Sequence, residues 1–239
     1  MIDKLLVKLR RYDDVSSEEE QVLRAAAGET IEFRRGQTIV KARTELSAST
    51  LLIEGLVHSF KDLGDGSRQT VQLAVPGDFI DLHSLLMKQV DHNLGALSNC
   101  RVVKFPHERL IDITQHHAHL ARLLWLSTVI DGAIERETIM SLGIRSSVSR
   151  LAHLFCELQV RFEVVGLAES RSYDLQLNQE ELSEILGMTP VHINRMLKEL
   201  RERGLLTFRG HVVEISDWNG LVALAEFDPF YLDLRQRPR

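Results

Sequence analysis

Residues 177–200 read LNQEELSEILGMTPVHINRMLKEL and predict two short helices joined by a tight turn. Asn178, followed three residues later by an acid, is typical of a capped helix start. Gly187 can adopt the left-handed conformation that ends a helix. Thr189 and Pro190 then suit the start of a second helix, because a hydroxyl caps the first turn and proline fits the first helical position. The segment therefore predicts a helix-turn-helix.

The second predicted helix has two chemically different faces. Its apolar residues recur at helical spacing and are expected to be buried: Ile193, Met196, Leu197 and Leu200. The opposite face carries Val191, Asn194, Arg195 and Lys198. Amide, guanidinium and ammonium groups match the base edges and phosphates of a DNA major groove. The alternative is a small helical subdomain whose charged face is only solvated.

A short hairpin is expected to follow this helix. Gly204 ends the helix, and residues 205–215 alternate around the turn Arg209-Gly210-His211, which makes the motif a winged helix. Residues 189–211 hold five basic and two acidic side chains, whereas the whole chain has a net charge of −5. A DNA-binding surface would therefore be local.

Residues 30–105 have the pattern of an all-β domain. Short runs such as Val71, Leu73 and Val75 alternate at period two, and Leu63-Gly64-Asp65-Gly66 reads as a hairpin loop. Many short strands at near-regular spacing favour an antiparallel sandwich or barrel. The first thirty residues read as short helices.

From Pro106 the pattern is helical for more than thirty residues, up to Gly143. A helix of this length exceeds what one small core covers, so we predict that its apolar stripe pairs with the same helix of a second copy. The alternative is a helix packed on its own β-domain. The stripe consists of Leu120, Leu123, Leu124, Ile130 and Ile134.

Composition excludes several classes of protein. The chain of 239 residues is 44% hydrophobic and 26% charged, as expected for a soluble globular protein. No apolar run could span a bilayer, and the first residues lack the apolar core of a signal peptide, so we expect a cytoplasmic protein with no membrane contact. The two cysteines, Cys100 and Cys156, are expected in the core rather than as redox sensors.

No motif for catalysis or for a bound metal stands out. The sequence has no P-loop, no Gly-x-Ser-x-Gly and no His-Glu-x-x-His, so we do not expect an enzyme. His116 and His119 are three residues apart and could share an ion, but no acid or cysteine lies at ligand spacing. We therefore predict no metal and no cofactor, and leave the roles of His116, His117 and His119 open.

Three stretches resemble the Crp/Fnr regulators: residues 51–57 (LLIEGLV), residues 76–79 (PGDF) and the helix-turn-helix up to residue 206. The resemblance implies an α+β protein with a β-roll sensor domain like a cyclic-nucleotide-binding jelly roll (1–106), a dimerisation helix (107–143) and a winged helix-turn-helix domain (144–239). It also implies a homodimeric transcription regulator that binds a palindromic site in double-stranded promoter DNA, with RNA polymerase as a further partner. Arg195 would contact a base, usually guanine. The residues expected to contact DNA are Thr189, Val191, His192, Asn194, Arg195, Lys198, Arg209 and His211.

The chain departs from the family pattern where ligands bind. Members that bind cyclic nucleotides carry a Gly-Glu pair, here Asp81-Leu82, and an arginine in a segment that aligns with residues 90–94, which hold none. Members with an iron–sulfur cluster need four cysteines. A family glutamate of the recognition helix is replaced by Val191, which can pack on a thymine methyl but cannot accept from cytosine. A second hypothesis is a sensor module that regulates a protein partner without binding DNA.

Overall fold

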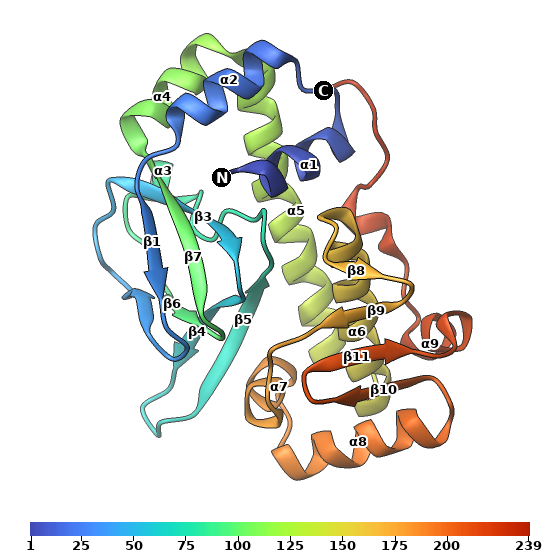
Figure 1. Cartoon of the computed structure of the whole chain (residues 1–239). Helices are drawn as coiled ribbons and strands as arrows, with labels where there is room; N and C mark the ends of the chain where they lie inside the picture. The colour runs from blue at the N-terminus through green and yellow to red at the C-terminus, as the bar shows by residue number, and fades with distance from the viewer.

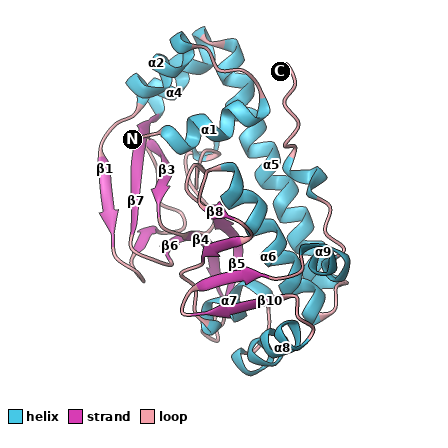
Figure 2. Ribbon diagram, turned by 45° about the vertical axis from the view of Figure 1, so that its right-hand side comes forward, coloured by secondary structure: helices cyan, strands magenta, loops and turns pink.

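The structure is a computed structural model that describes residues 1–239, and it confirms the predicted α+β architecture (Figure 1). Two short helices precede a β-roll, a long helix follows, and a small α/β unit ends the chain. Figure 2 shows the strands in two groups, with helices around them. No helix combines the length and apolar character needed to cross a bilayer. The elements before the long helix are α1 (Asp3–Tyr12), α2 (Ser17–Ala26), β1 (Thr30–Phe33), β2 (Thr38–Val40), β3 (Ala48–Glu54), β4 (Val57–Asp62), β5 (Arg68–Ala74), α3 (Ser84–Met87), β6 (Asn93–Ala96) and β7 (Cys100–Pro106).

The β-roll consists of two antiparallel sheets, with strand orders β1-β7-β3 and β2-β6-β4-β5. A small core of buried side chains, among them Leu52, Val57, Leu94 and Val102, belongs to the roll alone. The hairpin of β4 and β5 turns at residues 63–67, as the glycine-rich loop predicted. In β3 and β4 consecutive residues are buried, so both faces of these strands are covered.

The long helical region is two helices, α4 (His107–His116) and α5 (Ala118–Gly143), because His117 leaves the helical conformation between them. The stripe predicted to pair with a second copy is covered by the chain itself. All five of its side chains are at most 6% exposed and belong to the main core: Leu120, Leu123, Leu124, Ile130 and Ile134. The predicted dimer contact through these residues is therefore wrong, and α5 packs on its own chain along this face.

The C-terminal part begins with α6 (Ser147–Val164), whose buried side chains continue the main core. A four-stranded antiparallel sheet, β10-β11-β9-β8, lies beside the helix-turn-helix. Within this sheet β9 pairs with β11 in antiparallel register. The remaining elements are β8 (Ala168–Glu169), β9 (Ser172–Asp174), α7 (Gln179–Leu186), α8 (Pro190–Glu202), β10 (Leu206–Arg209), β11 (Val212–Ile215), α9 (Trp218–Ala225) and a 3-10 helix, η1 (Pro229–Leu232).

A buried ion cluster joins the two halves. Asp78, in the turn after β5, accepts hydrogen bonds from Lys8 of α1 at 2.5 Å and from Arg161 of α6 at 2.8 Å. Arg161 also donates to the carbonyl of Leu73 and to the carboxylate of Glu157. Burial alone would raise the pKa of Asp78, but the charges of Lys8 and Arg161 outweigh it and lower that pKa to about 2. The cluster fixes α6, and with it the helix-turn-helix, against the roll.

Removing one member of this cluster tests its contribution to stability. We expect Arg161→Ala to lower the free energy of unfolding by about 3–5 kcal/mol, because it leaves buried Glu157 without its cation and Asp78 with Lys8 alone. Arg24 is the matched control, since it also pairs with two acids but is exposed. Arg24→Ala should cost less than about 1 kcal/mol. Equal losses for the two variants in urea unfolding would contradict a structural role for the buried cluster.

Candidate nucleic-acid interface and internal pocket

The helix-turn-helix forms by the local signals that predicted it. The side chain of Asn178 accepts from the N–H of Glu181, and the side chain of Glu181 accepts from the N–H of Asn178, so two backbone donors at the start of α7 are satisfied. Gly187 has a φ of 60° and ends α7 in the left-handed conformation. The hydroxyl of Thr189 accepts from the N–H of His192 at the start of α8. These caps fix where one helix ends and the next begins.

The two faces of α8 are exposed and buried as predicted. Ile193, Met196 and Leu200 are buried, and Leu197 is partly buried against the same core. Of the residues predicted to contact DNA, Thr189, Val191, Asn194, Arg195 and Lys198 are exposed, with Val191 at 82%. His192 is half-buried, and its Nε2 accepts from the guanidinium of Arg195 at 3.1 Å. One face of α8 is thus free to approach a ligand.

The hairpin of β10 and β11 lies next to α8 and turns through Arg209, Gly210 and His211. Gly210 and His211 both have positive φ, which the tight turn requires. Arg209 and His211 are exposed at its tip. Because β11 also pairs with β9, the hairpin is held by a larger sheet.

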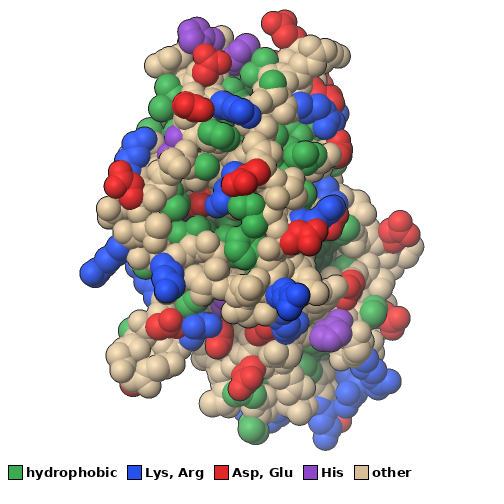
Figure 3. Space-filling view, turned by 60° about the vertical axis from the view of Figure 1, so that its left-hand side comes forward, with side chains coloured by type: hydrophobic (Ala, Val, Ile, Leu, Met, Phe, Trp, Pro, Cys, Tyr) green, Lys and Arg blue, Asp and Glu red, His purple; other side chains and the backbone are tan.

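Positive charge is concentrated where α8 lies. Lys198 and Arg203 form ion pairs along the helix with Glu202 and Glu199. Three further cations, Arg195, Arg201 and Arg209, make no ion pair with a carboxylate. Figure 3 shows Lys and Arg side chains gathered at the lower end of the molecule, the end that α8 forms in Figure 1. Unpaired guanidinium groups on an exposed helix and hairpin suit contacts with phosphates and base edges.

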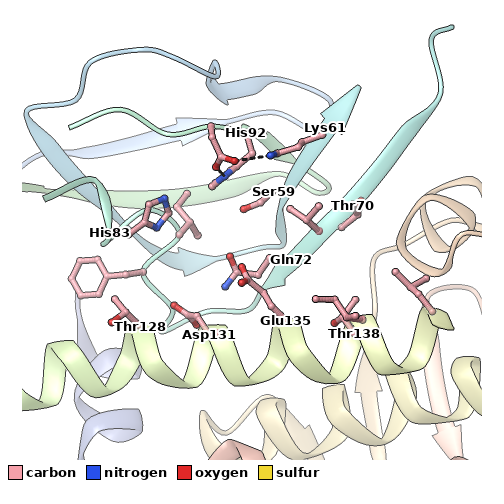
Figure 4. A pocket seen from close by; sticks show the side chains of 17 residues that line it. Ser59, Lys61, Thr70, Gln72, His83, His92, Thr128, Asp131, Glu135 and Thr138 are labelled. Atoms are coloured by element: carbon pink, nitrogen blue, oxygen red, sulfur yellow. Dashed lines mark hydrogen bonds and ion pairs between the residues drawn. The ribbon is translucent and has the colours of Figure 1, made fainter. Parts of the chain in front are cut away.

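A second candidate site is a cavity of about 480 Å³ between the roll and α5 (Figure 4). The sequence did not predict it, because tertiary packing alone brings its walls together. Asp91 pairs with Lys61 at 2.6 Å and with His92 at 2.9 Å. The Nε2 atom of His92 is buried and has no hydrogen-bond partner. The polar wall from the roll includes Ser59, Lys61, Gln72, His83, Asp91 and His92, and α5 contributes Thr128, Asp131, Glu135 and Thr138.

Comparison with known proteins identifies both halves of the chain. The profile of the Crp-like helix-turn-helix domain matches residues 149–224, and that of the cyclic nucleotide-binding domain matches residues 30–117. The chain is a member of the Crp/Fnr family. The proteins of this family are DNA-binding transcription regulators, and this chain is one of that type.

Individual relatives agree with this assignment. The fumarate and nitrate reduction regulatory protein of Salmonella typhi is 26% identical over 81% of this chain and 77% of its own length. The anaerobic regulatory protein of Haemophilus influenzae is 23% identical over 80% of this chain and 74% of its own length. The structure of FixK2 from Bradyrhizobium japonicum shares the fold, with a TM-score of 0.75, 23% identity, and coverage of 83% of this chain and 96% of FixK2.

The pocket of this Crp/Fnr protein does not fit a cyclic nucleotide. Lys61 is its one Lys or Arg side chain and is paired with Asp91, whereas Asp131 and Glu135 add further carboxylates. Burial raises the pKa of Asp131 to about 7, although the charge of Lys8 opposes that shift. A cyclic phosphate would face the carboxylate of Glu135 and the carboxyl group of Asp131, without a free lysine or arginine.

The residues that align with the family's nucleotide ligands lie elsewhere. Leu82 is packed in the main core. Asp81 is fully buried and accepts from the N–H and the hydroxyl of Thr50; burial raises its pKa to about 6. Arg101 forms an exposed ion pair with Glu54 and does not line the pocket. Neither the ribose nor the phosphate of a nucleotide would find its usual partner.

The cysteines do not fit an iron–sulfur cluster, which four thiolates normally hold. The chain has two cysteines, and burial raises the pKa of Cys100 to about 11 and that of Cys156 to about 12. Both lie in the core, as predicted.

The three histidines around residue 117 have separate surroundings. His119 bridges Glu19 and Asp13 at 2.6 and 3.1 Å, which ties the start of α5 to the N-terminal helices. His116 pairs with Asp112 one turn earlier in α4, and His117 lies between the two helices. The role left open for His119 is thus a structural contact.

We predict that cyclic AMP and cyclic GMP do not bind in this pocket. Burying their phosphate without a free cation would cost several kcal/mol, which is enough to erase a micromolar affinity of about 8 kcal/mol. Calorimetric titration should give no saturable heat with either nucleotide, and Arg101→Ala should behave in the same way because Arg101 lies outside the pocket. Saturable binding of either nucleotide with a Kd below about 10 μM would contradict the conclusion that the pocket does not fit a cyclic nucleotide.

Proposed function

We propose that this chain is a homodimeric transcription regulator that reads a palindromic promoter site with α8 of each copy. The observation that carries the proposal is the exposed face of α8, on which Asn194 and Arg195 point away from a buried core. Residues 1–106 would form the sensor domain that binds an effector, residues 107–143 would form the dimer contact, and residues 144–239 would bind DNA. The pocket between the roll and α5 would hold an effector other than a cyclic nucleotide, and RNA polymerase would be met at the promoter.

Different residues of α8 and its hairpin would have different tasks on DNA. The guanidinium of Arg195 can donate two hydrogen bonds to a guanine, and Val191 can pack against a thymine methyl. Lys198, Arg209 and His211 suit phosphates, which position the protein without reading sequence. A module that regulates a protein partner without DNA would leave this set of exposed donors without a task.

The dimer contact is proposed on the exposed face of α5, opposite the buried stripe. Trp125 is 71% and Ile139 is 69% exposed, and Val129 is half exposed. Together with Gly132 and Arg136 they recur at intervals of four and three residues, the spacing of a two-helix seam. Three large apolar side chains exposed along one line of a helix, at Trp125, Val129 and Ile139, are typical of an interface.

Substitutions in α8 separate base reading from phosphate binding. Arg195→Ala should cost about 1–3 kcal/mol on the specific site and relax one base position, because it removes contacts to a base. Lys198→Ala should weaken binding to specific and random duplexes alike and reduce the salt slope by about 1. Fluorescence anisotropy over a range of salt concentrations measures both effects. If both variants lost the same affinity on specific and random DNA, this division of roles would be wrong.

A charge on the exposed face of α5 should break the dimer. We expect Trp125→Glu to weaken dimerisation by at least about 2 kcal/mol, since the one aromatic side chain of the seam is lost and a charge is buried. Leu86→Glu is the control, because Leu86 is an exposed apolar residue, at 84%, on α3 and not on α5. Sedimentation equilibrium should show monomers for Trp125→Glu alone. A wild-type monomer, or a dimer unaffected by Trp125→Glu, would count against the proposed contact.

A further inference from the structure

A segment beyond α9, residues 226–239, connects the helix-turn-helix half back to the N-terminal helices. In Figures 1 and 2 it leaves α9 and runs beside α5 toward α1 and α2. At its far end the N–H of Arg237 donates to the carbonyl of Tyr12 at 3.0 Å, and the N–H of Arg239 donates to the carboxylate of Asp13 at 2.6 Å. The amide of Gln236 donates to Asp14 at 2.7 Å. We call residues 226–239 the strap.

The strap is also anchored in the middle. Leu232 is 3% exposed and packs in the main core with Phe227. The hydroxyl of Tyr231 donates to Glu157 of α6 at 2.7 Å, and burial followed by the charge of Glu157 raises the pKa of Tyr231, so that the phenol keeps its proton. Phe230, by contrast, is 75% exposed.

The anchor at Glu157 reaches the buried ion cluster. Glu157 accepts from Arg161 at 2.9 Å, and Arg161 donates to Asp78 of the roll at 2.8 Å. A continuous set of hydrogen bonds therefore runs from the strap through α6 to the roll. The strap is thus connected to the helix-turn-helix half and, through Arg161, to the roll. The relative position of these two halves decides where α8 points.

The strap and the residues that hold its far end lie outside the domains that the family profiles match, whereas its middle anchor, Glu157, lies inside one. Those profiles cover residues 30–117 and 149–224, whereas the strap begins at residue 226 and docks on residues 12–14. Between the profiles, the backbone connection from α5 to α6 at residues 144–146 links the halves covalently. The pairs Asp78–Arg161 and Arg35–Glu181 also join them, and the strap adds a further attachment that restricts rotation about the connection.

We propose that the strap positions the helix-turn-helix half against the roll, with Tyr231 as the positioning residue that acts through Glu157 and Arg161. The DNA consequence rests on the proposed function. Two recognition helices that read one palindrome must keep a fixed separation, so a loose helix-turn-helix half weakens binding to two half-sites more than binding to one.

Hydrogen exchange and DNA binding test this on the full chain. Exchange is followed at β5 and α7, where the side chain of Gln69 donates to the carbonyl of Glu184 across the two halves. Tyr231→Phe removes only the hydroxyl, and Gln236→Ala removes an exposed contact, so neither should unfold the chain. Phe230→Ala is the control within the strap. We expect the amides of β5 and α7 to exchange faster than in the wild type in Tyr231→Phe and Gln236→Ala. In Phe230→Ala their exchange rates should equal those of the wild type.

The same variants are compared on a palindrome and on a duplex with a single half-site. Tyr231→Phe should bind the palindrome about tenfold more weakly, and the single half-site within about twofold of wild type. Unchanged exchange at β5 and α7, or equal losses on both duplexes, would overturn the proposal. A wild-type protein that shows no binding to any duplex would overturn the proposed function, whereas the exchange result would still decide whether the strap positions α7.

Discussion

The pairing of Asp78 with Arg161 is the interaction on which the arrangement of the two halves depends. Asp78 lies in a turn of the roll, and its partners come from α1 and α6, so three parts of the chain meet at one carboxylate. Each of these charges would be costly to bury alone, so the cluster is stable only when all partners are in place. Since α6 leads into the helix-turn-helix, the cluster helps to decide that the open face of α8 points away from the roll.

Local signals in the sequence predicted the elements near the DNA surface. The caps at Asn178, Gly187 and Thr189 depend on a few neighbouring residues, so the sequence alone places them. Local signals could not tell which face of α5 is buried within the chain and which is exposed. The helix has one apolar stripe through Leu123 and another through Trp125, and periodicity does not say which one the chain itself covers. The pocket and the strap depend on contacts between distant residues and left no local pattern.

Departures from the family pattern concern what this regulator senses and reads. The pocket lies between the roll and α5, its one lysine is paired with Asp91, and the buried Nε2 of His92 lacks a partner. An effector that fits this pocket would carry hydrogen-bond donors for Asp131 and Glu135 and a polar group that contacts the Nε2 atom of His92. On α8, Val191 is exposed, and under the proposed function an apolar side chain there would favour thymine at that position of the half-site.

The central claim is that two copies of this chain read one symmetric DNA site. Selection of bound fragments from a random duplex library, followed by sequencing, tests it most directly. The account predicts an inverted repeat with a guanine in each half-site and half-site centres about one helical turn, ~34 Å, apart. Recovery of a single unrepeated half-site, of a direct repeat, or of no enriched sequence would contradict it.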